Sequence, residues 1–512
     1  MLLAGGTAVA GTVVAPTAVV PAASAAAAGP RVNPYRRTPV PTAMQRHLMN
    51  RLGCGFSSPT FARMRRAGSP NAWFEEQLRP ASVKEPGRAA AVDGWFPDLG
   101  ESPTTKWQRN SSGSKGGWEY AADLAGWSML RRVYSERQVL ETMVELWSDH
   151  LHVNANGDLA WTHRADYDAT IRAHALGTFE ELLVACTLHP AMLLYLDGWR
   201  STRAAPNENH GRELLELHTV GRVAGYTEAM VKDSARILSG FTVDAFKSWD
   251  GFYDPVRHAT GPVQVLGFSH ANGAPDGQDV TRAYLRYLAH HPATAHNVAR
   301  RLARKFVSDH PSNALVGDLA DVFRRSGTDI RATLQALVAH PEFRGSKGRL
   351  VRTPLEDFVA TCRVLRVQVQ APTGRQSFAR SAVWVPQTTL AYQWPRPDGP
   401  PYGADAWASA TRMLSSFRMH WNLTAGWWPR EDVAYRSPAS WLPERSVRLD
   451  RYVDHLSRVL LGRPSNARIL GAALEAVGHG PATKVTRAHP LAGWQFVRLA
   501  GALLDSPDHM SR

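Results

Sequence analysis

Apolar residues recur at helical spacing along most of the chain. The clearest pattern covers residues 135–150, and its apolar positions are Val139, Leu140, Met143, Leu146 and Trp147. Spacings of three and four residues place such side chains on one face of an α-helix. The same pattern marks 167–176, 178–187, 209–218, 227–238, 279–290, 293–307, 313–326, 329–339 and 354–367.

Strand signals are few. Apolar residues alternate with other residues at 263–267 and 383–385, which predicts a small hairpin or edge strands. The dipeptide His-Pro occurs at residues 189, 291, 310 and 340, and each marks a helix boundary because the residue before proline disfavours the helical conformation. We therefore expect a mainly α fold class: a large multi-helix domain with at most a few short strands.

The ends of the chain predict its domain organisation. Residues 1–28 carry no charged side chain and finish near the small residues Ala23-Ser24-Ala25, a pattern typical of an export signal. A flexible Ala-rich tail or a membrane anchor is the alternative. Residues 29–43 form a Pro-rich linker, and 44–510 form the helical domain, in two lobes that meet near 240–277. No later stretch is long and apolar enough to span a membrane, so we expect a secreted or cell-wall-associated protein outside the cytoplasm, with no transmembrane span in the mature chain.

Positive charge limits the class of partner. The chain has 59 Lys and Arg against 45 Asp and Glu, a formal net charge of +14, which favours polyanions. The basic residues are dispersed in short pairs and no nucleic-acid recognition motif accompanies them, so nucleic acid is not an expected partner. An acidic cell-wall polymer or an exported partner protein fits better. The three cysteines are too few and too far apart for a disulfide framework.

Six short segments of the sequence together carry a resemblance to a known family. They are 47–56, 143–152 (Met-Val-Glu-Leu-Trp-Ser-Asp-His-Leu-His), 207–221 (beginning Asn-Glu-Asn-His-Gly-Arg-Glu-Leu), 291–295, 304–307 (Arg-Lys-Phe-Val) and 394–399 (Trp-Pro-Arg-Pro-Asp-Gly). In this order they resemble the DUF1800 family of bacterial exported proteins. The resemblance implies export and often a sulfatase-like or phosphatase-like partner encoded nearby. It implies no established activity.

One predicted helix has a densely polar face. At 100° per residue, residues 207–218 place Asn209, Arg212, Glu213 and Glu216 close together. These four residues either face solvent or line a cleft. In a cleft, Glu213 and Glu216 would act as carboxylate ligands or acid/base groups, beside Arg212 and Asn209.

Three successive helical segments each direct one histidine inward. His150, His174 and His218 either form hydrogen bonds separately in the core or converge as ligands of a metal ion or haem. No local metal-binding motif such as His-Glu-x-x-His accompanies them.

Two hypotheses of function follow. The first is an exported, metal-dependent enzyme whose cleft contains the histidines and glutamates above. The alternative is a non-catalytic cell-surface or wall-binding protein that uses the Arg excess and exposed aromatic residues such as Trp427 and Trp428. The sequence has no Gly-x-Ser-x-Gly elbow and no phosphate-binding Gly loop, which disfavours serine hydrolase and nucleotide-dependent mechanisms.

Overall fold

The structure is a computed structural model that describes residues 30–512. The predicted export signal at 1–28 therefore lies outside the described residues. Within them the chain forms 25 α-helices and eight short strands. The predicted fold class, mainly α with a few short strands, is confirmed.

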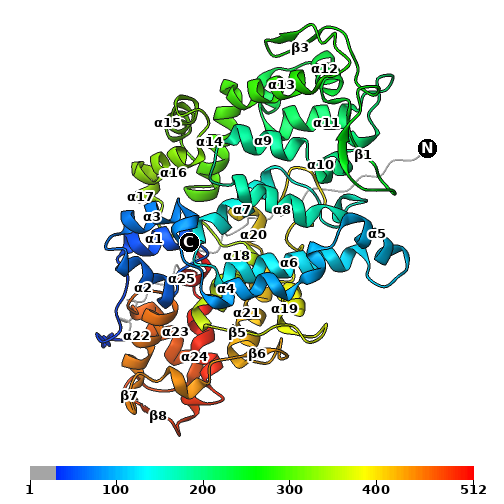
Figure 1. Ribbon diagram of the computed structural model, residues 1–512. Helices are drawn as coiled ribbons and strands as arrows, with labels where there is room; N and C mark the ends of the chain where they lie inside the picture. The colour runs from blue at the N-terminus through cyan, green and yellow to red at the C-terminus, as the bar shows by residue number, and fades with distance from the viewer. Residues whose placement is uncertain (1–29) are drawn as a thin grey trace, which may run out of the picture.

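The helices follow one another along the whole described chain (Figure 1). The first twelve are α1 (Ala43–Arg51), α2 (Ser58–Arg66), α3 (Pro70–Gln77), α4 (Gly87–Val92), α5 (Pro103–Ser111), α6 (Gly117–Tyr134), α7 (Gln138–His150), α8 (Arg164–His174), α9 (Phe179–Thr187), α10 (Pro190–Tyr195), α11 (Glu208–Glu213) and α12 (Glu228–Leu238). The remaining helices are α13 (Gln278–His290), α14 (Pro292–Phe306), α15 (Asn313–Arg325), α16 (Ile330–Ala339), α17 (Pro341–Gly345), α18 (Pro354–Leu365), α19 (Phe378–Ser381), α20 (Ala404–Trp407), α21 (Ala410–Ala425), α22 (Leu449–Leu460), α23 (Ala467–Val477), α24 (Phe496–Leu504) and α25 (Pro507–Met510).

The strands form four separate antiparallel pairs. They are β1 (Phe241–Val243) with β2 (Gly251–Tyr253), β3 (Val263–Val265) with β4 (Phe268–His270), β5 (Gln368–Val369) with β6 (Val433–Ala434), and β7 (Ser446–Arg448) with β8 (Lys484–Thr486). Val263 pairs with His270, so the predicted hairpin exists. The strand predicted at 383–385 is wrong, because Ala382–Trp384 forms a 3-10 helix in which Trp384 is exposed between buried valines.

Capping residues explain where many helices begin. The side chains of Ser57, Thr178 and Thr227 accept a hydrogen bond from the first turn of α2, α9 and α12, which satisfies a backbone donor that the helix leaves free. The ring of the histidine does the same in three His-Pro pairs, at α10, α14 and α17. These three predicted boundaries are confirmed.

The longest helix was not predicted. α6 buries most of its faces, including the side chains of Asp123, Ser128, Arg131 and Arg132. A helix that buries polar residues has no clean apolar stripe, so the periodicity argument misses it.

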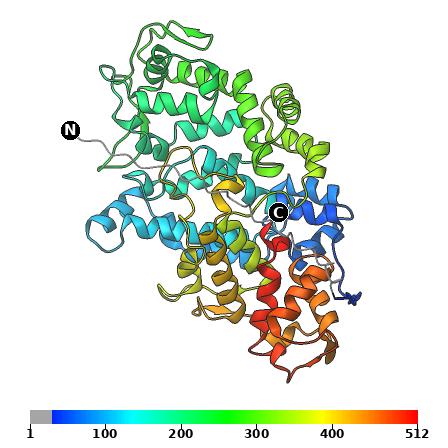
Figure 2. The ribbon, with the colours of Figure 1, turned by 180° about the vertical axis from the view of Figure 1, so that it is seen from behind.

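The helices share one hydrophobic core, which runs from Leu48 in α1 to Leu504 in α24. In Figure 1, α9 to α16 lie in the upper part of the molecule, α6, α7, α8 and α20 lie across the middle, and α21 to α24 lie below them. Seen from behind, the yellow and gold segment that contains α20 crosses the middle, between the green upper helices and the orange and red lower helices (Figure 2). Residues 240–277 contain β1 to β4, and β3 lies at the upper edge. A division into two lobes stays a prediction.

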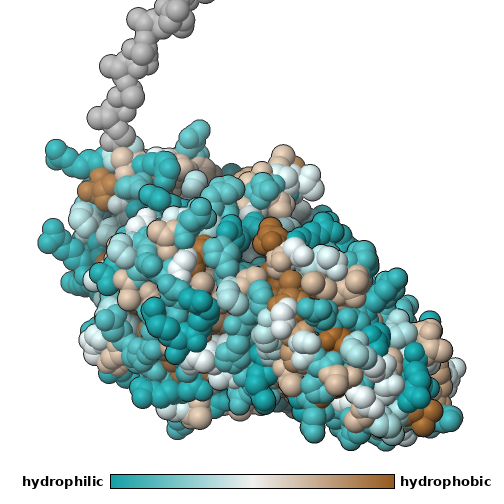
Figure 3. Space-filling view, turned by 90° about the horizontal axis from the view of Figure 1, so that it is seen from above, coloured by the Kyte–Doolittle hydropathy of each residue, from teal (hydrophilic) through white to brown (hydrophobic). Residues whose placement is uncertain are grey.

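The surface seen from above is mainly hydrophilic, with hydrophobic residues scattered over it (Figure 3). Among the described helices, none combines the length and the apolar character needed to span a bilayer.

Tyr35, in the Pro-rich segment 29–43, is buried against the C-terminal part of the molecule. Its backbone N–H donates to Asp454 Oδ2 at 2.7 Å. Asp454 also accepts hydrogen bonds from Arg458 Nε at 2.6 Å and from the Ser465 backbone N–H at 2.8 Å. This buried carboxylate therefore joins the first described residues to α22.

We expect Asp454→Ala to lower the melting temperature strongly. The substitution leaves Arg458 and two backbone donors buried without their acceptor, which costs about 3–5 kcal/mol for a buried ion pair. Thermal unfolding followed by circular dichroism measures the loss. The matched control is Asp318→Ala, whose side chain is 72% exposed and whose removal should leave the transition nearly unchanged. Equal melting temperatures for both variants would contradict the assigned role of Asp454.

Candidate functional site

A cavity lies at the centre of the molecule, where helices from distant parts of the chain meet. Its polar floor comes from α6, α7, α14 and the start of α18, and its largely apolar cover comes from residues 388–407. The cavity is partly open and has a volume of about 70 Å³, which is room for a few water molecules or one small ligand.

Lys305 of α14 is the centre of the floor and has no exposed surface. Its ammonium lies 3.2 Å from Glu145 Oε2 and 3.0 Å from Glu356 Oε1. Arg132 contacts the same oxygen of Glu145 at 2.6 Å, and Arg512 contacts Glu356 Oε2 at 3.2 Å. Positive and negative groups thus alternate along one buried chain. Each charge has an opposite partner, as burial requires.

Asp149 is the acidic group of the floor that has no such ion pair among the described residues. Burial raises its pKa to about 7, and the nearby carboxylate of Glu145 adds to the shift. Its Oδ2 accepts a hydrogen bond from the Tyr402 hydroxyl at 3.2 Å. A carboxyl group whose pKa is raised toward neutral pH can both give and take a proton more readily there than an ordinary aspartate.

The local sequence explains why these groups meet. Glu145 and Asp149 are four residues apart on α7, so they lie on one face of the helix. The cover is tied to the chain just beyond α7. His152 Nε2 donates to the Trp394 carbonyl at 2.9 Å, and the Ala155 N–H donates to the Tyr392 carbonyl at 2.7 Å.

Gly399 allows the cover to approach the floor closely. Its φ is +72°, and a Cβ at this position would clash with the carbonyl oxygen of Asp149. A side chain here would meet both a strained backbone and a steric clash. Glycine is therefore required where the cover crosses α7.

The predicted acidic face lies elsewhere, on α11 and the π-helix Leu214–His218 that continues it. Arg212 pairs with Glu228 at 2.5 Å, and Glu216 pairs with Arg222 at 2.5 Å. Asn209 is exposed. None of these residues is among those that line the central cavity.

Glu213, also on this face, is half-buried, and burial together with the Glu216 carboxylate raises its pKa. The catalytic role predicted for Asn209, Arg212, Glu213 and Glu216 stays a prediction.

The structure brings two of the three predicted histidines together. His150 and His218 are both buried, and His150 Nε2 donates to the His218 carbonyl at 3.0 Å. His174 is half-buried at the end of α8, and no described hydrogen bond or ion pair joins it to the other two.

Two further histidines, His152 and His210, lie in the same buried region, and both affect the pKa of His218. Burial lowers the pKa of His152 and His210 to about 4 and that of His218 to about 3. These rings are therefore neutral at physiological pH.

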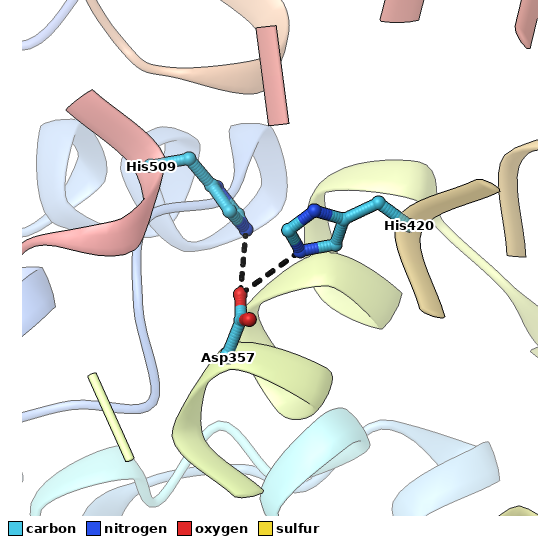
Figure 4. Close-up of side chains that lie close together, drawn as sticks. All are labelled: Asp357, His420 and His509. Atoms are coloured by element: carbon cyan, nitrogen blue, oxygen red, sulfur yellow. Dashed lines mark hydrogen bonds and ion pairs between the residues drawn. The ribbon is translucent and has the colours of Figure 1, made fainter. Parts of the chain in front are cut away.

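A different set of side chains meets the geometric requirement for a metal ion. Among the described residues, Asp357, His420 and His509 form the one group of three whose ligand atoms all lie within 4.8 Å of one another. Figure 4 shows both imidazole rings directed at the carboxylate of Asp357. They come from α18, α21 and α25, and the residues between them carry no local motif. Sequence reasoning missed this group for that reason.

We expect Glu213→Gln and Glu216→Gln to change the free energy of unfolding by no more than about 1 kcal/mol each. Arg222, the partner of Glu216, is 81% exposed, and ion pairs at such a surface contribute little. Urea titration of each variant and of the double variant measures the change. A loss of several kcal/mol would instead indicate that both carboxylates belong to a buried polar cleft.

Comparison with known proteins identifies a family but no activity. The family model described as "Protein of unknown function (DUF1800)" matches residues 47–511. No curated protein matches the chain, and no solved structure does.

Proposed function

This chain belongs to the DUF1800 family of proteins of unknown function, and we propose that it is an exported enzyme whose central cavity carries out acid–base chemistry on a small ligand. The observation that carries the proposal is Asp149, a buried carboxyl group with a pKa of about 7 beside a cavity. Strongly shifted acids in cavities are typical of catalytic sites. The uncharged residues at the start of the chain support export.

The position of the cavity supports the same proposal. Glu145 and Asp149 belong to the block at 143–152, Lys305 to the block at 304–307, and Trp394 to the block at 394–399. More than a hundred residues separate the first of these blocks from the second, and several helices separate the second from the third. Segments that resemble one family's recurring blocks therefore meet around one cavity.

The two carboxyl groups of α7 suit different roles. Glu145 forms ion pairs with Arg132 and Lys305. Asp149 has a raised pKa and contacts the Tyr402 hydroxyl. Two neighbouring acids in such different surroundings are a common basis of acid–base catalysis. The charged Glu145 would stabilise positive charge that develops on the ligand, while Asp149 gives or takes the proton.

The cavity also restricts the ligand. Its volume of about 70 Å³ admits only a small molecule unless the cover opens. Trp394 and Trp407 line its apolar part, and Asp149 with Tyr402 forms a polar part. A small, uncharged molecule that carries a hydroxyl or carbonyl group fits this combination.

A metal-dependent form of this enzyme would take its ligands from His150, His174 and His218. Burial lowers the pKa of His150 and His218, and neutral imidazoles suit a transition metal or haem. The hydrogen bond between His150 and His218 supports the pairing of those two residues alone.

We expect Asp149→Asn to gain stability relative to wild type as pH rises toward 7. Between pH 3.8, the ordinary pKa of Asp, and about 7, the folded protein keeps a proton on Asp149 that the unfolded chain releases. The contribution of Asp149 to stability therefore decreases with pH in this interval, by at most about 1.4 kcal/mol per pH unit. Asparagine cannot ionise and still accepts the Tyr402 hydrogen bond. Melting temperatures measured across this interval should favour the variant increasingly as pH rises.

The matched control is Asp405→Asn, an exposed acid on the same cover, which should keep the wild-type pH profile. Difference infrared spectroscopy of wild type against Asp149→Asn should show a protonated carboxyl group that disappears near pH 7. Small hydroxyl- and carbonyl-containing fragments should bind wild type and lose affinity in the variant. A carboxylate signal from Asp149 throughout this interval would refute the proposal.

The alternative function, binding of an acidic cell-wall polymer, has its own observation. Trp384, Trp421, Trp427 and Trp428 are 51%, 36%, 59% and 38% exposed. A groove lined by Trp384, Arg418 and Trp428 lies among them. Exposed aromatic rings beside a guanidinium suit a polymer that carries both sugar rings and acidic groups.

If this surface binds the wall, Trp427→Ala should reduce retention of the full chain on purified cell-wall material. Retention should also weaken as salt is added, because salt screens exposed charges. Trp494→Ala is the control, since Trp494 is 69% exposed outside this cluster. Equal retention of both variants, unchanged in high salt, would exclude the aromatic surface and its charge as the binding site.

A further inference from the structure

We propose that Asp357, His420 and His509 bind one zinc ion, which acts as a structural link between α18, α21 and α25. The three side chains lie outside the cavity described above, and their exposed fractions are 0%, 0% and 3%. The inference does not depend on the activity proposed for Asp149.

Two of the three distances between the ligand atoms are close to those of a tetrahedral ion, and all three atoms lie within 4.8 Å of one another. Asp357 Oδ1 lies 3.1 Å from His420 Nε2 and 3.4 Å from His509 Nε2. Ligands about 2.0–2.2 Å from zinc in a tetrahedral site lie roughly 3.3–3.6 Å from one another. Small shifts of these side chains would therefore leave room for an ion between the three ligand atoms, which face one another (Figure 4).

The groups around the ligands hold them in the orientation that a metal requires. His420 Nδ1 lies 2.6 Å from Asp505 Oδ1, so this carboxylate orients the ring with Nε2 directed at Asp357. A histidine that donates its other N–H to a carboxylate is the common outer arrangement of zinc sites. The second oxygen of Asp357 accepts from Ser416 Oγ at 2.8 Å and contacts Arg412 at 3.3 Å. Oδ1 is therefore the oxygen available to an ion.

The enclosure of the group favours zinc over iron. Two histidines and one carboxylate also bind iron in oxygenases, but those sites keep open positions for substrate. Here all three side chains are buried, and none of them lines the central cavity. The Thr361 hydroxyl lies 3.0 Å from His509 Nε2. Zinc accepts histidine nitrogen and carboxylate oxygen as ligands, and it is almost always four-coordinate in structural sites.

An ion here would fasten the end of the chain to the wall of the cavity. His509 lies in α25, and Asp357 lies in the first turn of α18, which follows the cavity-lining residues Thr353, Pro354 and Leu355. Loss of the ion should therefore loosen the C-terminal helices first.

The test is elemental analysis of the full chain, purified without a metal-affinity tag. We expect about one zinc per chain, and a melting temperature that falls after treatment with a chelator and recovers when zinc is added back. Cobalt loaded into the stripped wild-type protein should give the visible absorption bands of a tetrahedral nitrogen and oxygen site. This spectrum is measured on the wild-type protein, so it does not depend on whether a variant folds.

His420→Ala and His509→Ala should each reduce bound zinc to a small fraction of one per chain. His258→Ala is the matched control, because His258 is also fully buried but is held by hydrogen bonds to Ser239 and Asn272. It should lose stability and keep its zinc. Asp149→Asn should also keep its zinc, which separates this inference from the proposed function. Absence of zinc in both purified and zinc-treated wild type, with no effect of the chelator, would overturn the proposal and leave a hydrogen-bonded network. Stoichiometric iron would overturn the assignment to zinc.

Discussion

The fold depends on one buried ammonium group. Lys305 has no exposed surface, and a charge removed from water costs several kcal/mol unless opposite charges compensate it. Glu145 of α7 and Glu356 of α18 supply that compensation. Three helices that are far apart in sequence must therefore meet at one point. Arg132 and Arg512 extend the same chain of charges to α6 and to the last residue.

The protonation of Asp149 follows from this arrangement. Glu145 lies in the floor of the cavity one helical turn before Asp149 and forms ion pairs with Arg132 and Lys305. A negative charge on Asp149 is unfavourable because burial removes its solvation and the Glu145 carboxylate repels it. Glu145, which compensates the charge of Lys305, thus lies next to Asp149 and raises the pKa of that carboxyl group. The ion pair that stabilises the fold and the raised pKa that the proposed chemistry uses therefore both depend on Glu145.

Local periodicity predicted much of this fold and little of its candidate chemistry. Helices α7, α9 and α12 to α16 have apolar stripes, and their predicted bounds agree with the structure within three residues. The stripe of α7 and the apolar face predicted for 209–218 correctly place His150 and His218 in the interior. Periodicity selects apolar positions only, so it does not identify Glu145 and Asp149, which also lie on α7. Asp357, His420 and His509 come from three helices, and only the tertiary fold brings them together.

The first turn of α18 connects the two candidate sites. Thr353 caps this helix, and its backbone N–H donates to Glu356 Oε2, the same oxygen that faces Arg512. Glu356 points toward Lys305, whereas the next residue, Asp357, points toward His420 and His509. Adjacent residues on a helix diverge by about 100°, so one helical turn can serve the ion network on one side and the histidine pair on the other. A displacement of this turn would disturb the floor of the cavity and the anchoring of α25 together, because neither group of side chains can move without the other.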